Sequence, residues 1–119
     1  MITFNLPLPP SINHYYGHSG NRKFISKAGK KFRAQVQEIV TLAGHKKIEG
    51  RVSMWVAIHP STKRKQDLDN RAKSLQDALT HAGVWLDDEQ IDALHLLRKD
   101  VVKGGYVTVV IEELQRGAV

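Results

Sequence analysis

The chain has 119 residues, a formal net charge of +6 and no cysteine. A single domain of this length can bury a hydrophobic core, and the lack of cysteine excludes disulfides and thiolate zinc sites. We therefore expect a protein of a reducing compartment, the cytoplasm. The first apolar run is too short for a signal peptide, and no later run is long enough to span a membrane. The excess positive charge favours a polyanionic partner, and we expect neither a membrane nor a small-molecule substrate.

The first half of the chain predicts a strand, a loop and a helix. Residues 2–6 have strand character, and the prolines that follow could not donate to a central ladder. Residues 11–20 are predicted to form a polar loop. Ser26 suits a helix N-cap, and apolar residues at helical spacing then continue to Gly44, where we expect the helix to end.

The second half predicts a strand, a helix and two further strands. Alternating apolar residues over 51–59 indicate a strand, and helical spacing over 68–82 indicates a helix. Residues 91–102 and 106–114 read as two strands joined by the Lys-Gly-Gly turn at 103–105, which we interpret as a hairpin. The predicted fold is thus one α+β domain over 1–119 with the order β-α-β-α-β-β. It would pack a mixed sheet of about four strands against two helices.

Two aspartates lie close together at the start of the second predicted helix. In KRKQDLDNRAK, residues 63–73, Asp67 and Asp69 flank a single leucine. Aspartate is common at helix starts, where it caps free N–H groups and its charge meets the helix dipole, so a structural role is a strong alternative. One aspartate suffices for a cap, however, and the second aspartate with Asn70 adds further oxygen ligands. We regard the pair as candidate metal ligands.

Charged clusters on both sides of this segment support a metal site. The basic run at 63–65 precedes the aspartates and could steer phosphate toward them, and a second acidic group follows at 87–89. Carboxylates near basic residues suit Mg²⁺, which takes oxygen ligands and shares them with substrate phosphate. The chemistry indicated is phosphodiester hydrolysis. No nucleotide-binding glycine motif or nucleophile elbow is present, and the histidine spacing makes zinc improbable.

Four stretches of the chain form a pattern in order over almost its whole length. They are LPLPPSINHYY near the N-terminus, DLDNRAK at the second helix, LTHAGVWLDDEQI after it, and the KGG turn. In these stretches the chain resembles the RusA family of Holliday-junction resolvases. The resemblance implies a homodimeric endonuclease that uses Mg²⁺, or Mn²⁺ in its place. Such an enzyme resolves a four-way DNA junction by two symmetric nicks.

The resemblance also assigns residues. The family's catalytic aspartates, which hold the metal, fall on Asp67, Asp69 and Asp88, and its catalytic lysine falls on Lys73. Asn70 and Asp87 would be supporting residues. For Lys73, the residues alone leave a second interpretation open, which is a helical ion pair with Asp69. The family usually has a basic residue directly before the first aspartate, where this chain has Gln66.

Candidate DNA contacts come from three basic or aromatic segments. Lysines crowd the start of the first helix, where the helix dipole disfavours positive charge, and a docked phosphate would offset that cost. A solvated basic face is the alternative. The neighbouring tyrosines could stack on unpaired bases or simply cover the core. The candidates are Asn13, Tyr15, Tyr16, Lys27, Lys30, Lys31, Arg33, Lys63, Arg64 and Lys65.

Two questions remain open at this point. The runner-up function is a non-catalytic basic module that recognises the shape of DNA, with its aspartates serving as caps. The acidic pair Asp87 and Asp88 argues against it, because such a module gains nothing from carboxylates that repel DNA. The second question concerns Asp88. A helix over 69–82 is about 20 Å long, so the chain would have to return fully extended. This estimate favours an acidic site shared between two subunits.

Overall fold

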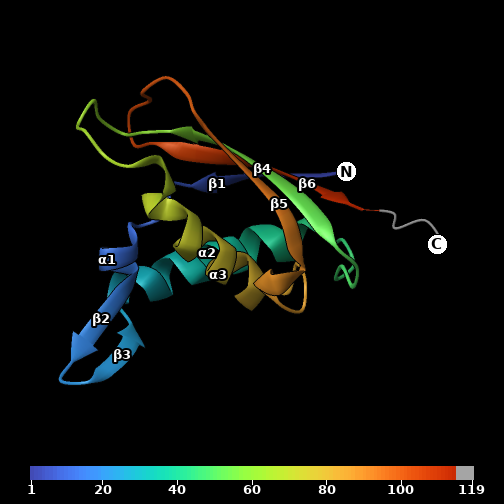
Figure 1. Cartoon of the computed structure of the whole chain (residues 1–119), viewed down its shortest axis with the longest axis horizontal. Helices are drawn as coiled ribbons and strands as arrows, with labels where there is room; N and C mark the ends of the chain where they lie inside the picture. Colours follow the sequence, from blue (N-terminus) through green and yellow to red (C-terminus); the bar gives the residue numbers. More distant parts are fainter. Residues whose placement is uncertain (115–119) are drawn as a thin grey trace.

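A computed structural model describes residues 1–114 of the chain (Figure 1). The predicted helices and strands are present, with a short helix and a hairpin in addition. The elements are β1 (Ile2–Pro7), α1 (Ile12–Tyr15), β2 (Tyr16–Ser19), β3 (Arg22–Ile25), α2 (Lys27–Ala43), β4 (Val52–His59), the 3₁₀ helix η1 (Leu68–Arg71), α3 (Ala72–His81), the 3₁₀ helix η2 (Asp88–Gln90), β5 (Ile91–Arg98) and β6 (Tyr106–Glu113).

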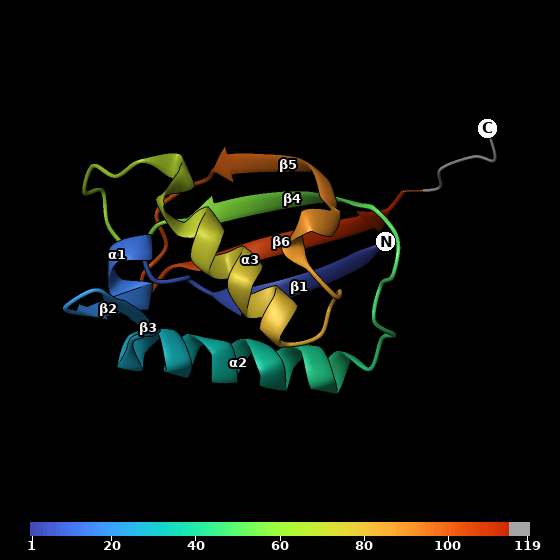
Figure 2. The same cartoon turned by 60° about the horizontal axis from the view of Figure 1, so that its bottom comes forward.

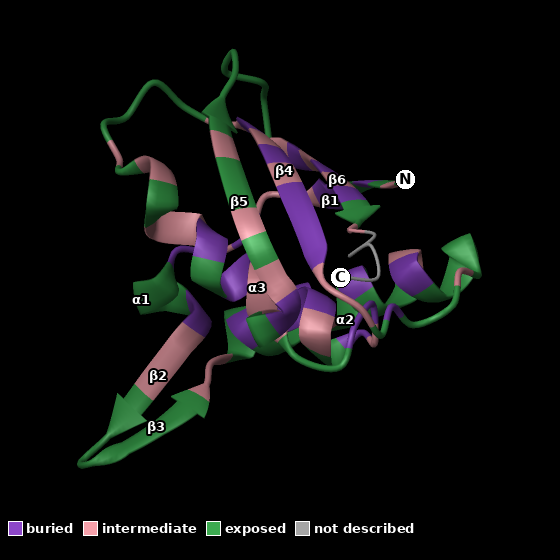
Figure 3. Cartoon of the chain, turned by 45° about the vertical axis from the view of Figure 1, so that its right-hand side comes forward, coloured by how far each residue is buried: buried purple, intermediate pink, exposed green. Residues whose placement is uncertain are grey.

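A mixed sheet of four strands forms one layer, and α2 and α3 form the other (Figure 2). The strand order is β1-β6-β4-β5, with β4 and β5 parallel and the other two pairs antiparallel. The alternation predicted for β4 is confirmed, since Val52, Met54, Val56 and Ile58 are all buried. Most of β4 is coloured as buried in Figure 3, and both helices show buried residues between exposed ones. The α+β fold and the mixed sheet are therefore as predicted.

The hairpin predicted for the last two strands is wrong. The turn itself exists, and Gly104 and Gly105 have positive φ angles of 83° and 67°. However, β4 lies between β5 and β6 and pairs with both. Lys99 N donates to Ile58 O at 2.8 Å, so the connection passes over the end of β4. The turn signal gave the reversal of direction correctly, but it carries no information on which strand fills the space between.

The loop predicted over 11–20 is also wrong, because this segment contains α1 and β2, the first strand of the hairpin of β2 and β3. The two strands pair from Tyr16 with Ile25 to Ser19 with Arg22. Gly20 has a φ of 62°, and with Asn21 it forms the two-residue turn. A Gly-Asn turn between short strands is a hairpin signal that the sequence analysis missed. The hairpin projects from the body of the molecule and is largely exposed (Figures 1 and 3).

The first long helix begins and ends where the sequence predicts. The Ser26 side chain accepts a hydrogen bond from Gly29 N at 3.0 Å, and Gly44 adopts a left-handed C-cap conformation. Phe32, Val36 and Val40 face the core from this helix.

A polar network joins the three α-helices beside the core. Tyr15 is fully buried, and its hydroxyl group donates to Asp77 Oδ2. Arg33 Nη2 also donates to Asp77 Oδ2, at 2.7 Å, and Arg33 Nε donates to the Tyr15 hydroxyl at 2.8 Å. Tyr15 thus has the core role that the sequence left open, and its assignment as a base-stacking residue is wrong.

The network also determines the charge state of its members. Burial raises the pKa of Tyr15, and the hydrogen bond to Asp77 raises it further. Burial opposes ionisation of Asp77, but the hydrogen bonds from Tyr15 and Arg33 outweigh it, so the pKa of Asp77 lies below its ordinary value. The Asp77 carboxylate is therefore ionised in the folded protein at neutral pH.

Replacing Asp77 with Asn should destabilise the fold in a pH-dependent way. We expect a loss of about 1–2 kcal/mol at neutral pH, because charged hydrogen bonds are lost from a half-buried site. A lowered folded-state pKa means that this stability is present above the unfolded-state value, near 4, and is lost as the pH falls through the lower folded value. Urea denaturation of both proteins at about pH 7 and about pH 3 measures the difference.

The exposed loop residue Asp100 supplies a matched control, since Asp100→Asn makes the same chemical change outside the network. A difference between wild type and Asp77→Asn that is equally large at both pH values would contradict the proposed charge state.

Candidate active site

The two aspartates of the DLDN segment lie on a short 3₁₀ turn in front of α3. Asp67 occupies the N-cap position of η1, but its side chain accepts no capping hydrogen bond. Asp67 and Asp69 are both exposed, and Asn70 beside them is half-buried. The capping alternative for Asp67 is therefore not realised, and both carboxylates remain accessible to a ligand.

The second acidic segment is held rigidly by buried side chains. Trp85 is 1% exposed, and its Nε1 donates to Thr80 on α3 at 2.7 Å. The buried amide of Gln90 donates to the carbonyls of Ile48 and Gly50 and accepts from two backbone N–H groups, those of Leu86 and Asp87. The sequence analysis assigned no role to Trp85 or Gln90, because the importance of each depends on partners that only the fold supplies.

Asp87 and Asp88 have different roles in this segment. Asp87 caps η2 by accepting a hydrogen bond from Glu89 N at 3.0 Å, and that bond lowers the pKa of Asp87. Asp88 instead faces α3, where Lys73 Nζ lies 3.4 Å from Asp88 Oδ2. The pairing of Lys73 with Asp69, which the residues left open, is not the one found. Lys73 and Asp88, which lie 15 residues apart in the sequence, are thus brought together.

The chain does return along α3 within one subunit. The α-helix α3, Ala72–His81, is about 15 Å long and follows η1 directly. Trp85 bonds to Thr80 at the end of this helix, and Asp88 reaches Lys73 at its start. A second subunit is not needed to bring Asp88 and Lys73 together. No contact among the described residues joins Asp88 to Asp67 or Asp69, so the sharing of these carboxylates between subunits stays a prediction.

The three aspartates do not form a closed cage in this structure. Within residues 1–114, no three side chains of aspartate, glutamate, histidine or cysteine are close enough to ligate one ion together. Mg²⁺ usually takes only one or two protein carboxylates and completes its shell with water and substrate phosphate. The exposed Asp67 and Asp69 fit that mode of binding.

The base of the β2–β3 hairpin adjoins this site. Burial raises the pKa of Tyr16, and the nearby charges of Asp77, Lys73 and Asp88 also act on the phenol group. The ammonium group of Lys23 lies 3.9 Å from the centre of the Tyr16 ring. The hairpin therefore extends outward from the neighbourhood of Lys73 and Asp88.

The predicted DNA contacts fall into three groups in the structure. Arg33 is bound to Asp77 in the network and Tyr15 is buried, so neither offers a free surface group. Tyr16 is half-buried at the base of the hairpin. The others are exposed on α1, on the first turn of α2 and on the loop after β4: Asn13, Lys27, Lys30, Lys31, Lys63, Arg64 and Lys65.

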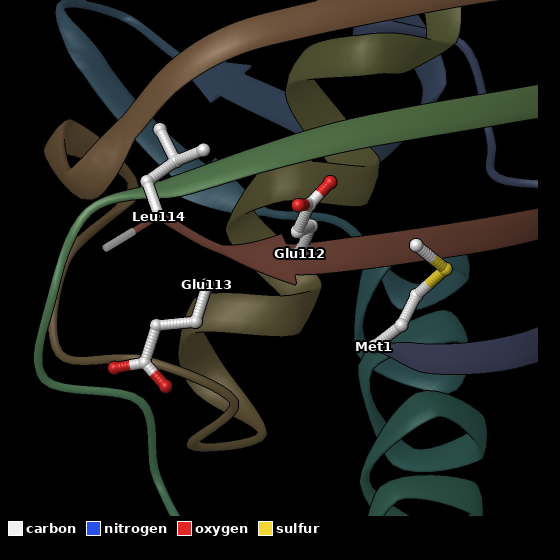
Figure 4. A pocket seen from close by; sticks show the side chains of 4 residues that line it. All are labelled: Met1, Glu112, Glu113 and Leu114. Carbon is white, nitrogen blue, oxygen red and sulfur yellow. The ribbon is translucent and has the colours of Figure 1, made fainter. Parts of the chain in front are cut away.

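Two cavities mark opposite ends of the sheet. One, of about 430 Å³, lies between α1 and the segment 61–71, next to the aspartates. Another, of about 610 Å³, is lined by Met1, Glu112, Glu113 and Leu114 where β6 ends (Figure 4). The second cavity includes none of the predicted site residues, so the first is the cavity associated with the site.

The sequence profile described as Endodeoxyribonuclease RusA matches residues 7–112. The chain belongs to the RusA family. It is 39% identical to the crossover junction endodeoxyribonuclease of Enterobacteria phage HK97 over 113 residues, which cover 94% of each chain. It is 37% identical to the RusA protein of Escherichia coli strain K12 and 38% identical to that of Shigella sonnei strain Ss046, again over 94% of each chain. The family predicted from the four motifs is thus confirmed.

No helix among the described residues is long and apolar enough to cross a membrane.

Replacing Gln90 with Ala should loosen the acidic segment. The backbone N–H groups of Leu86 and Asp87 lose their acceptor, and the carbonyl groups of Ile48 and Gly50 lose their donor. We expect faster hydrogen exchange at Leu86 and Asp87 and a loss of about 1–3 kcal/mol in the free energy of unfolding. Gln37→Ala, on the exposed side of α2, is the control. Unchanged exchange at both amides would show that Gln90 does not position the segment.

Proposed function

We propose that this protein is an endonuclease that resolves four-way DNA junctions by paired, symmetric, metal-dependent nicks. The single observation that best supports this proposal is the approach of Lys73 to Asp88 next to the exposed pair Asp67 and Asp69. It brings the second acidic segment to the start of the helix that follows the first one. The relatives, which match over nearly their whole length, are named crossover junction endodeoxyribonucleases.

Each residue of the site has a role in this proposal. Asp67 and Asp69 would hold Mg²⁺, or Mn²⁺ in its place, with Asp88 completing the set when DNA is bound. The ion would supply a nucleophilic hydroxide and stabilise charge on the scissile phosphate. Lys73 would leave Asp88 and neutralise a phosphate oxygen, which a compact ammonium group can do. Asp87 and Asn70 support the site, the first by capping η2 and the second by its position beside Asp69.

Exposed cations extend from this site in two directions. Lys27, Lys30 and Lys31 line the first turn of α2, and the basic run 63–65 lies on the loop before η1. We propose that both groups, with Asn13 and Tyr16, contact the DNA backbone and position the junction.

Two symmetric cuts require two copies of the site, and we therefore propose a homodimer with a two-fold axis. Each site would be built within one chain, in agreement with the contact between Lys73 and Asp88. The cytoplasmic location expected from the cysteine-free composition stays a prediction.

Asp69→Asn should abolish cleavage and preserve binding to a synthetic four-way junction. The substitution removes a proposed metal ligand, and the loss of one negative charge should, if anything, tighten DNA binding. Gel assays of nicking and of complex formation, with and without Mg²⁺, measure both effects. A linear duplex of the same sequence is the control for junction selectivity. Appreciable nicking by Asp69→Asn would falsify the ligand assignment.

Neutralising Lys30 and Lys31 together should reduce the salt dependence of junction binding. Each lost phosphate contact lowers the slope of log affinity against log salt concentration by about one unit. The measurement is a series of binding titrations at increasing salt, with the same double substitution at Lys46 and Lys47 as the control. An unchanged slope would show that Lys30 and Lys31 make no phosphate contact and form only a solvated basic face.

Mixed dimers can test whether each site lies within one chain. With Asp67→Asn in one subunit and Asp88→Asn in the other, both sites should be damaged and the dimer inactive. With both substitutions in one subunit and a wild-type partner, one site stays intact and junctions should receive single nicks. If the sites were shared between subunits, the first dimer would keep one intact site and give single nicks. The second dimer would have two damaged sites and be inactive.

A further inference from the structure

The cavity beside the aspartates has an unusual set of lining residues. It is lined by Ser11, His14, Ser61, Thr62, Arg64, Lys65, Gln66, Asn70 and Arg71. Three of these are cations and none is an aspartate or glutamate, although Asp67 and Asp69 lie on the same stretch of chain. Residues 66, 70 and 71 line the cavity and the two aspartates do not, so the turn separates its positive and negative groups.

Arg71 is the lining residue of this cavity with the greatest need for an anion, because its guanidinium is half-buried without a counter-ion. Its Nη1 donates to the carbonyl of Pro9 and its Nε to Gln66 Oε1 at 3.0 Å. The other half-buried arginines, Arg33 and Arg51, each form ion pairs with carboxylates, whereas within residues 1–114 Arg71 has no acidic partner. Burial lowers the pKa of Arg71, as expected for a desolvated cation that nothing neutralises.

The structure holds the Arg71 side chain in place without neutralising it. Gln66 Oε1 accepts from Nε, and the backbone carbonyl of Gln66 accepts a hydrogen bond from Arg98 Nη2 at 2.9 Å. Nη2 has no hydrogen bond within the described part of the chain. A planar guanidinium with a fixed orientation and free donors suits a phosphate oxygen. A bound anion would also offset the cost of burying the unpaired charge.

His14 completes the set from the opposite wall. Its Nδ1 lies 2.8 Å from Ser11 Oγ, which leaves Nε2 without a hydrogen bond in the described residues. Arg64 and Lys65 are exposed at the rim. The cavity therefore offers a central guanidinium, an imidazole and two further cations to one anionic group, and its volume lies in the range that binds small ligands.

We propose that this cavity is a subsite for a DNA backbone phosphate next to the scissile one, with Arg71 as the main contact and His14 and Arg64 beside it. The inference rests on the proposed function, since it takes DNA to be the substrate at the neighbouring aspartates. A phosphate held here would fix the register of the strand, so that the adjoining phosphate meets Asp67 and Asp69 on the other side of the turn. Arg71 is thus a positioning residue for the reaction.

The test couples a change in the protein to a change in single DNA phosphates. Four-way junctions are prepared with one neutral methylphosphonate at each position around the cleavage point in turn, and binding is measured without divalent ions. Arg71→Met, which keeps an apolar stem of similar length, should weaken binding of the unmodified junction about tenfold. In the wild type, a methylphosphonate at one position should lower the binding affinity by a similar factor. In Arg71→Met a methylphosphonate at that position should lower the affinity by less than about twofold, because the contact is already lost.

Lys47→Met is the matched control, since it removes one charge from the segment before β4, which lines a different cavity. It should leave the methylphosphonate pattern unchanged. Arg71 also holds the Pro9 carbonyl, so thermal unfolding must show that Arg71→Met is folded. Arg64→Met at the exposed rim provides a second variant, and it should reduce the cost at the same methylphosphonate position.

A titration with inorganic phosphate separates this inference from the function on which it rests. Amide shifts over residues 61–71 should change in the wild type and not in Arg71→Met. If the wild type fails to bind junctions but phosphate still shifts these amides, the nuclease proposal fails and the anion subsite stands. The opposite result is also possible: junctions are bound and nicked, but the loss of binding free energy from Arg71→Met adds to the loss from every methylphosphonate. In that case the subsite is overturned and the nuclease proposal stands.

Discussion

The arrangement of the three helices depends on one half-buried carboxylate. Asp77 on α3 accepts hydrogen bonds from Tyr15, which ends α1, and from Arg33 on α2. An ionised carboxylate is stable away from water only when its partners replace the lost hydration, and here a phenol and a guanidinium do so together. Asp77 lies one helical turn after Lys73, so the network that fixes α3 also fixes the direction from which Lys73 meets Asp88. Structure and candidate site are thus coupled through a single helix.

Elements whose signals are local were predictable from the sequence. The alternation in β4 and the helical spacing with its Ser26 cap and Gly44 end identify two elements almost to the residue. Which strands pair with each other was not predictable in the same way. The glycines at 103–105 do reverse the chain, but insertion of β4 between β5 and β6 depends on contacts between residues some 50 positions apart along the chain. Sheet order results from such long-range contacts, which a pattern within one segment does not encode.

The same distinction applies to the candidate site. The aspartates at 67, 69 and 88 and the lysine at 73 became candidates because charged residues at close spacing near a basic run are visible in the sequence, and because the motifs resemble a family. Trp85 and Gln90 were not found, since a tryptophan and a glutamine have no functional signal until their partners Thr80 and Ile48 are known. Tyr15 shows the reverse case, where an aromatic residue predicted to stack on DNA bases proved to be buried.

The turn at 66–71 places two exposed carboxylates close to a half-buried guanidinium that has no counter-ion within residues 1–114. Asp67, Asp69 and Arg71 lie within five positions of one another, and an ion pair with either aspartate would neutralise that carboxylate and the half-buried guanidinium. The structure instead directs Arg71 to Gln66 and to the Pro9 carbonyl, both neutral, and leaves the aspartates in solvent. Such a separation lowers stability relative to an internal ion pair. It becomes favourable when each side receives its own external partner, a cation for the carboxylates and an anion for the guanidinium. A metal ion and a phosphodiester backbone are one such pair of partners, and a nuclease site must bind both at once.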